Sequence, residues 1–198
     1  MLIRTFVFTF MLFVAPAYAA QESTTIDVVP APAASVDPVK KRAQEIDKLF
    51  GELHKGSSTN PRATVEKIWA LWSRNDSAMA EILLTQSGKA MRDGVFQTSE
   101  QMMNALLGSY PDYTEALNQR AMLYYNMKRY DDALVDVEAV LAEEPRHFGA
   151  LSGLAAIYQA KGDVGKAAAA LRDAISVNPH LQTAKDALKQ LEHDYPNI

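Results

Sequence analysis

The most restrictive feature of this sequence is a proline that recurs at a fixed interval. Pro111, Pro145 and Pro179 are equally spaced along the chain. Aligning residues 113–145 with residues 147–179 gives six identical positions, which are Ala116 with Ala150, Leu117 with Leu151, Ala121 with Ala155, Tyr124 with Tyr158, Ala133 with Ala167 and Pro145 with Pro179. A period of about 34 residues is typical of a repeat protein, in which each unit has an apolar face that only its neighbour can bury.

The repeated positions predict a helix–turn–helix unit. Small residues such as Ala121 and Ala133 allow two helices to pack closely, and a large residue such as Tyr124 fills the space between helix pairs. Proline lacks a backbone donor and therefore belongs in the turn before the next unit. A more divergent copy precedes the two good ones, and its matching residues are Leu83, Ser87, Ala90, Gly94, Phe96, Ser99, Met103 and Pro111.

Over residues 80–179, this pattern resembles the tetratricopeptide-repeat (TPR) family. The resemblance implies an all-α fold, a right-handed αα-superhelix of about three repeats. It also implies a concave groove that holds a peptide or a partner domain. Residues 80–112 form the degenerate repeat, and residues 114–147 and 148–181 form the two good repeats.

Further helices are predicted on both sides of the repeats. Residues 37–75 predict a helical hairpin, because Asp37-Pro38 and Asn60-Pro61 each combine an N-cap residue with proline at the first helical position. We expect this hairpin to cover the N-terminal end of the repeat stack. Residues 182–198 predict a capping helix and tail at the other end. No stretch of the sequence shows sustained strand alternation, so the whole chain is expected to be helical.

The N-terminus has the pattern of a cleaved signal peptide over residues 1–19. Arg4 precedes an apolar stretch that runs from Thr5 to Ala15, and small residues follow at positions 17 and 19. A membrane-spanning helix needs about 20 apolar residues, more than this stretch contains, so we expect no stable membrane anchor after cleavage. Residues 20–36, rich in Pro, Ala and Ser, predict a flexible spacer.

The compartment expected for the mature chain is the periplasm. The segments at 68–72 and 146–153 are similar to those of short exported TPR proteins of Gram-negative bacteria. That similarity agrees with a signal peptide and implies no activity of its own.

Composition and motifs argue against several classes of chemistry. The chain has no cysteine, which excludes disulfides, thiolate metal sites and cysteine nucleophiles. Its 20 basic residues are outnumbered by 24 acidic ones, without the basic excess of a nucleic-acid binder. None of the four histidines has the spacing of a helical metal pair or adjoins a serine nucleophile motif. We therefore predict a protein that is not an enzyme and has no cofactor and no metal.

The predicted function is that of an adaptor or scaffold that binds another protein or a peptide. In the TPR family, ligand contacts come from positions on the first helix of each repeat that point away from the packing face. The candidate partner-binding residues are Met91, Arg92, Asn118, Met122, Tyr125, Asn126, Ser152 and Gln159. The same carry-over also includes Glu81, Leu84, Gly88, Glu115, Gly149, Ala156 and Ala160.

One known ligand of the family is not expected here. Some TPR proteins bind the C-terminal carboxylate of a partner with a clamp of lysines and asparagines. In this chain the clamp positions are Leu84, Gly88, Gly149 and Gly153, so recognition of a chaperone tail is not predicted.

The segment from Arg146 to Gly153 leaves two interpretations open. Gly149 and Gly153 lie inside a predicted helix, where each costs about 1 kcal/mol relative to alanine. Close helix packing, which we favour, or a partner lying against the backbone would offset that cost. We expect His147 to be a solvated turn residue. The alternative function is a small-molecule or metal binder, or an enzyme, that uses Arg146 and His147. The sequence leaves the partner and the oligomeric state open.

Overall fold

A computed structural model of the protein describes residues 38–54, 60–75 and 77–196. The predicted signal peptide, the predicted spacer and Asp37 lie outside these ranges. No helix within them has both the length and the hydrophobicity that crossing a bilayer requires.

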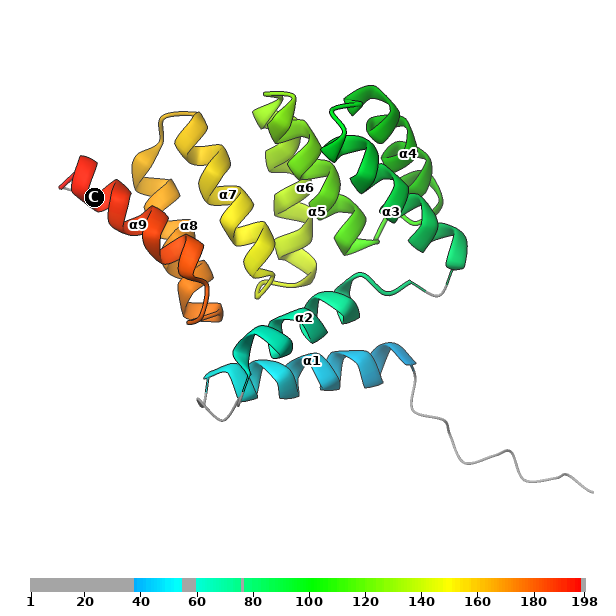
Figure 1. Ribbon diagram of the computed structural model, residues 1–198, viewed down its shortest axis with the longest axis horizontal. Helices are drawn as coiled ribbons and strands as arrows, with labels where there is room; N and C mark the ends of the chain where they lie inside the picture. Colours follow the sequence, from blue (N-terminus) through cyan, green and yellow to red (C-terminus); the bar gives the residue numbers. More distant parts are fainter. Residues whose placement is uncertain (1–37, 55–59, 76, 197–198) are drawn as a thin grey trace, which may run out of the picture. The chain divides into compact units, whose positions relative to one another are not determined.

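The regular structure of the described residues consists of nine α-helices (Figure 1). They are α1 (Pro38–His54), α2 (Pro61–Trp72), α3 (Ala78–Arg92), α4 (Phe96–Ser109), α5 (Thr114–Asn126), α6 (Tyr130–Glu143), α7 (Phe148–Ala160), α8 (Val164–Val177) and α9 (Gln182–Asp194). Helices α3 to α8 form three consecutive pairs, which confirms the prediction of an all-α array of helix–turn–helix repeats.

The packing inside the pairs follows the predicted pattern. Ala121 of α5 and Ala133 of α6 are buried together in one apolar cluster, and Tyr124 lies in the same cluster. The Arg129 guanidinium stands 4.3 Å from the centre of the Tyr124 ring. The helices of this pair are also joined by Arg120, whose Nε and Nη2 donate to the buried Asp136 carboxylate at 2.8 and 2.7 Å. This hydrogen bond raises the pKa of Arg120.

The turn within each pair contains one residue with a left-handed backbone. These residues are Gly94 (φ 77°), Lys128 (φ 60°) and Gly162 (φ 82°), which occupy equivalent positions of the three repeats. Glycine adopts this conformation without steric cost, whereas lysine adopts it at a steric cost. The middle repeat therefore contains a strained turn that its neighbours avoid.

The C-terminal helix caps the stack as predicted. Ala184 and Leu191 of α9 are buried in one cluster with Leu171 and Ala174 of α8. The opposite, outer positions of α9 are exposed and mostly polar. This distribution agrees with the solvated outer face that a terminal helix requires.

The position predicted for the N-terminal hairpin is wrong. Helices α1 and α2 were expected to cover the end of the stack beside the degenerate repeat. Their apolar residues, including Phe50, Ile68 and Trp72, are instead buried in one cluster with Phe148 at the start of α7. The hairpin therefore packs against the third helix pair. The sequence pattern marks the apolar faces of α1 and α2 but not the surface that buries them.

The hairpin contacts the turns that precede α5, α7 and α9. The N-cap residues of α5, α7 and α9 are Tyr113, His147 and Leu181, which follow one another at the interval of the repeat. The Tyr113 hydroxyl donates to the Ser73 carbonyl, and the His147 ring stacks on Trp72 with ring centres 4.1 Å apart. Leu181 packs against the hairpin cluster. Three equivalent positions of the repeat thus support one helical hairpin.

Candidate binding groove

An aromatic cluster joins the hairpin to the third repeat. Trp69 meets Trp72, His147 and Phe148 edge to face, with ring centres 5.5, 5.3 and 5.4 Å apart. Edge-to-face pairs at this distance are favourable, because the positive edge of one ring meets the negative face of the other. The three contacts together fix the orientation of the Trp69 ring.

His147 is part of this cluster, and the prediction that it is solvated is wrong. Its side chain is fully buried. Nδ1 accepts a hydrogen bond of 3.0 Å from the Ala150 amide and so caps α7. The proton of a neutral ring is therefore on Nε2, which lies 3.4 Å from Glu115 Oε2. The sequence could not show that the hairpin covers this turn.

Arg146, the neighbouring residue, also holds the hairpin. Its guanidinium donates to Asp47 of α1 at 2.8 Å and to Glu144 at 2.9 Å, and it lies 4.7 Å from the centre of the Phe50 ring. The hydrogen bond to Glu144 is the main cause that raises the pKa of Arg146. Arg146 and His147 thus have structural partners in place of the ligand that the alternative function requires.

Gly149 has its place in the fold because of Trp69. A β-carbon at position 149 would stand 2.5 Å from Cη2 of Trp69 and 2.9 Å from its Cζ2. Atoms cannot approach so closely, so only glycine fits beneath the ring. The expectation that packing explains the glycines is confirmed for Gly149. At Gly153 the nearest side-chain atom, Cγ2 of Val137, would be 4.0 Å away, which leaves room above the helix.

A groove of about 530 Å³ opens between α5 and α7, with Trp69 of α2 also in its wall. The residues that line it are Trp69, Asn118, Ala121, Met122, Tyr125, Asn126, Val137, Gly149, Ser152, Gly153, Ala156 and Ile157. Every one of these lining residues is uncharged. Tyr125 is supported from behind by Tyr130, whose ring centre is 5.7 Å away.

Five of the eight candidate residues meet in this groove. They are Asn118, Met122, Tyr125, Asn126 and Ser152. Arg92 and Gln159 are exposed but do not line the groove, and Met91 is only 9% exposed. Met91 is therefore not available to a partner, and the prediction for that residue is wrong. It fails because α3 turns this side chain into the protein.

The first-turn positions of the same helices contact the protein itself. Gly149 lies beneath Trp69, and Glu115 is buried beside His147. Glu81 accepts a hydrogen bond of 3.2 Å from the Asn75 amide, in the segment that follows α2. The hairpin and this segment cover one end of the surface that the family resemblance assigns to ligands, so that end is not open to a partner.

Three important groove residues were not predicted from the sequence. Val137 and Ile157 form its apolar floor, and Trp69 stands in its wall. The sequence does contain tryptophans in the hairpin and glycines in a later helix, and a large ring over a glycine is a common packing arrangement. It does not show which tryptophan lies over which glycine.

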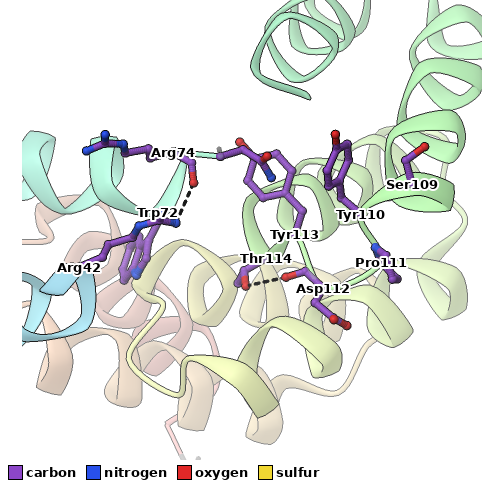
Figure 2. A pocket seen from close by; sticks show the side chains of 10 residues that line it. Arg42, Trp72, Arg74, Ser109, Tyr110, Pro111, Asp112, Tyr113 and Thr114 are labelled. Atoms are coloured by element: carbon purple, nitrogen blue, oxygen red, sulfur yellow. Dashed lines mark hydrogen bonds between the residues drawn. The ribbon is translucent and has the colours of Figure 1, made fainter. Parts of the chain in front are cut away.

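A second cavity, of about 390 Å³, lies where the hairpin meets the turn before α5 (Figure 2). Arg42 donates to the Arg74 carbonyl at 3.0 Å, and Tyr113 and Thr114 face them across the cavity. Among the described residues, no group of three histidine or acidic side chains is placed to hold a metal ion. The cavity is lined mostly by polar residues and lies between the hairpin and the repeats.

Comparison with known proteins identifies the repeat. A family model described as tetratricopeptide repeat matches residues 127–191. A TPR repeat-containing protein of Rhizobium etli is 30% identical over 149 residues, which cover 75% of this chain and 73% of that protein. The chain belongs to the TPR family.

Solved structures with the same fold include other TPR proteins. The first TPR of Spaghetti (RPAP3), bound to an HSP90 peptide, has a TM-score of 0.58 at 18% identity and covers 62% of this chain and 97% of its own. MamA from Desulfovibrio magneticus has a TM-score of 0.55 at 20% identity and covers 79% of this chain and 86% of its own. At these identities the likeness shows the fold alone.

Proposed function

We propose that this TPR protein is a non-enzymatic adaptor that holds a segment of a partner protein in the groove between α5 and α7. The observation that carries the proposal is the meeting of Asn118, Met122 and Tyr125 in one open groove. Met122 is 48% exposed although it is a large apolar residue. An exposed methionine side chain can adapt its shape to a partner, and an exposed tyrosine offers a rigid contact surface. Both residue types are common at protein–protein interfaces.

The partner segment is uncharged where it enters the groove. A charged group moved from water to this lining would lose its hydration without an ionic partner among the lining residues, which costs several kcal/mol. Apolar side chains gain from the same transfer. Asn118 and Asn126, near Met122, supply amide groups that can orient the segment by hydrogen bonding.

A structure of a similar fold supports peptide binding in general. The Spaghetti (RPAP3) domain is bound to the HSP90 peptide SRMEEVD. An acidic peptide of that kind does not suit the uncharged groove of this chain. Leu84 and Gly88, at two of the clamp positions, are buried residues of α3. That comparison therefore supports the use of a TPR as a peptide receptor. The chemistry of the ligand is inferred from the groove of this chain.

The place of action in this proposal is the periplasm. The support is the signal-peptide pattern of residues 1–19, with cleavage expected before Ala20. N-terminal sequencing of the protein recovered from its native host tests this part. A mature chain that begins at Ala20 is the expected result, and a chain that retains residues 1–19 contradicts export by cleavage.

The test of groove binding is site-specific photo-crosslinking in the native envelope. A photo-reactive residue at Met122 should give a discrete crosslinked partner, and Asn118→Ala with Tyr125→Ala should remove it. The control position is Val135 of α6, which is 66% exposed and is not among the groove-lining residues. Equal crosslinking from both positions, or crosslinking that persists in the double variant, would refute the groove as the binding site.

A small apolar molecule is the second candidate ligand, because the groove volume of about 530 Å³ is within the usual range of small-molecule sites. A thermal-shift screen with metabolites and metal ions tests it, since a true ligand raises the melting temperature by mass action. A compound that stabilises the wild type but not Met122→Glu would favour this reading. A shift that depends on Arg146 and His147 instead would support the use of those two residues.

A further inference from the structure

The part of the groove formed by α2 lies outside the repeats and has a fixed shape. Trp69 lines the groove while its ring is held by Trp72, His147 and Phe148. A ring that is already immobilised loses little conformational freedom when a ligand packs on it. Tryptophan is also the residue type most enriched among the side chains that dominate binding energy. Trp69 is therefore a preformed contact surface.

The residues that form the α7 wall of the groove have small side chains. Gly149, Ser152, Gly153 and Ala156 occur at successive spacings of three, one and three residues, so they share one face of α7. Trp69 covers Gly149, and the small side chains of Ser152, Gly153 and Ala156 allow another backbone to approach the rest of this face closely. The apolar floor beneath them is formed by Val137 and Ile157.

The polar groups of the lining are too few for an extended peptide. An extended chain carries one backbone N–H and one C=O per residue, and each must find a partner when buried. Among the lining residues, polar side-chain groups are carried by Trp69, Asn118, Tyr125, Asn126 and Ser152, and the Ser152 hydroxyl already donates to the Phe148 carbonyl at 2.8 Å. These groups cannot pair every backbone N–H and C=O of an extended segment several residues long. An α-helix satisfies its own backbone groups and so can be buried here at lower cost.

We propose that the occupant is the apolar face of an α-helix from the partner protein, packed along the small residues of α7 with a large apolar side chain against Trp69. This proposal rests on the proposed function and adds the form of the partner and a specificity-determining residue. The uncharged lining requires an amphipathic helix whose charged residues stay on its outer face.

A displayed library of random peptides, each long enough for about five helical turns, is selected on the mature protein and provides the probe. Selected peptides should carry apolar residues at i, i+3, i+4 and i+7 and should gain helicity on binding, measured by circular dichroism. Trp69→Ala should weaken their binding by at least about tenfold, and Trp69→Phe by less. Gly153→Leu, which places a large side chain in the groove, should also abolish binding.

The outcomes separate this inference from the proposed function. Peptides that require Met122 but show strand-like alternation, stay non-helical when bound, or ignore both Trp69→Ala and Gly153→Leu overturn the helix proposal and leave the adaptor function standing. Failure to select any peptide whose binding is lost in Met122→Glu contradicts both. Folding of each variant is checked by its helical circular dichroism, and Gly153→Leu tests the groove if Trp69→Ala releases the hairpin.

Discussion

The ring of Trp69 lies directly against Gly149, a residue of a much later helix, and leaves no room there for a β-carbon. This contact links the N-terminal hairpin to the first turn of α7. It also fixes one wall of the groove, because both residues line it. The position of the hairpin and the shape of the proposed binding site are therefore determined by the same pair of residues.

Gly149→Ala should destabilise the protein. Alanine favours a helix over glycine by about 1 kcal/mol, but the overlap with Trp69 costs about 1–3 kcal/mol, so we expect the free energy of unfolding to fall by about 1 kcal/mol. Urea denaturation measures the change, and tryptophan fluorescence reports displacement of the ring. Gly153→Ala is the matched control, since its β-carbon meets nothing closer than 4.0 Å and should stabilise the protein. Equal stabilisation by both substitutions contradicts the packing assignment.

His147→Ala should reduce stability by about 2–4 kcal/mol, because it removes the N-cap of α7, the stacking on Trp72 and buried volume together. His147→Asn should cost less, since an asparagine side chain can still accept the Ala150 amide. His180→Ala, at an exposed residue, serves as a control and should change stability by less than about 0.5 kcal/mol. If His147→Ala is as mild as His180→Ala in chemical denaturation, the buried role fails.

The repeats could be predicted from the sequence because their signals are local. The prolines, the alanine pairs and the apolar spacing of each helix determine helix–turn–helix units whatever lies around them. The hairpin could not be placed in this way. Its contacts with Tyr113, His147 and Leu181 join residues far apart in the chain, and a tyrosine, a histidine and a leucine share no common pattern. For the same reason Met91 and Glu115, at positions assigned to ligands, proved to be buried.

Lys128→Gly should stabilise the protein by up to about 1 kcal/mol, because lysine at φ 60° carries the steric cost of a left-handed backbone that glycine avoids. The reciprocal change at the equivalent turn, Gly162→Lys, should destabilise by a similar amount. Both residues lie in turns, and thermal unfolding of the two variants in parallel makes the comparison. A destabilising Lys128→Gly would mean that the lysine side chain supports the turn more than its backbone strain opposes it.

The buried Tyr113 hydroxyl should make stability depend on alkaline pH. Burial, reinforced by the Glu115 carboxylate, raises the pKa of Tyr113 from 10.0 to about 12. Between these values the native chain keeps the phenol proton that the unfolded chain has lost. The contribution of this group to the free energy of unfolding is therefore fully present below pH 10. It falls as pH rises toward 12, by at most about 1.4 kcal/mol per pH unit.

Urea denaturation across this range should show a shallower fall in stability for Tyr113→Phe than for the wild type. Tyr195→Phe, at a residue that is 49% exposed, should keep the wild-type slope, and identical slopes in all three proteins would show that Tyr113 titrates normally.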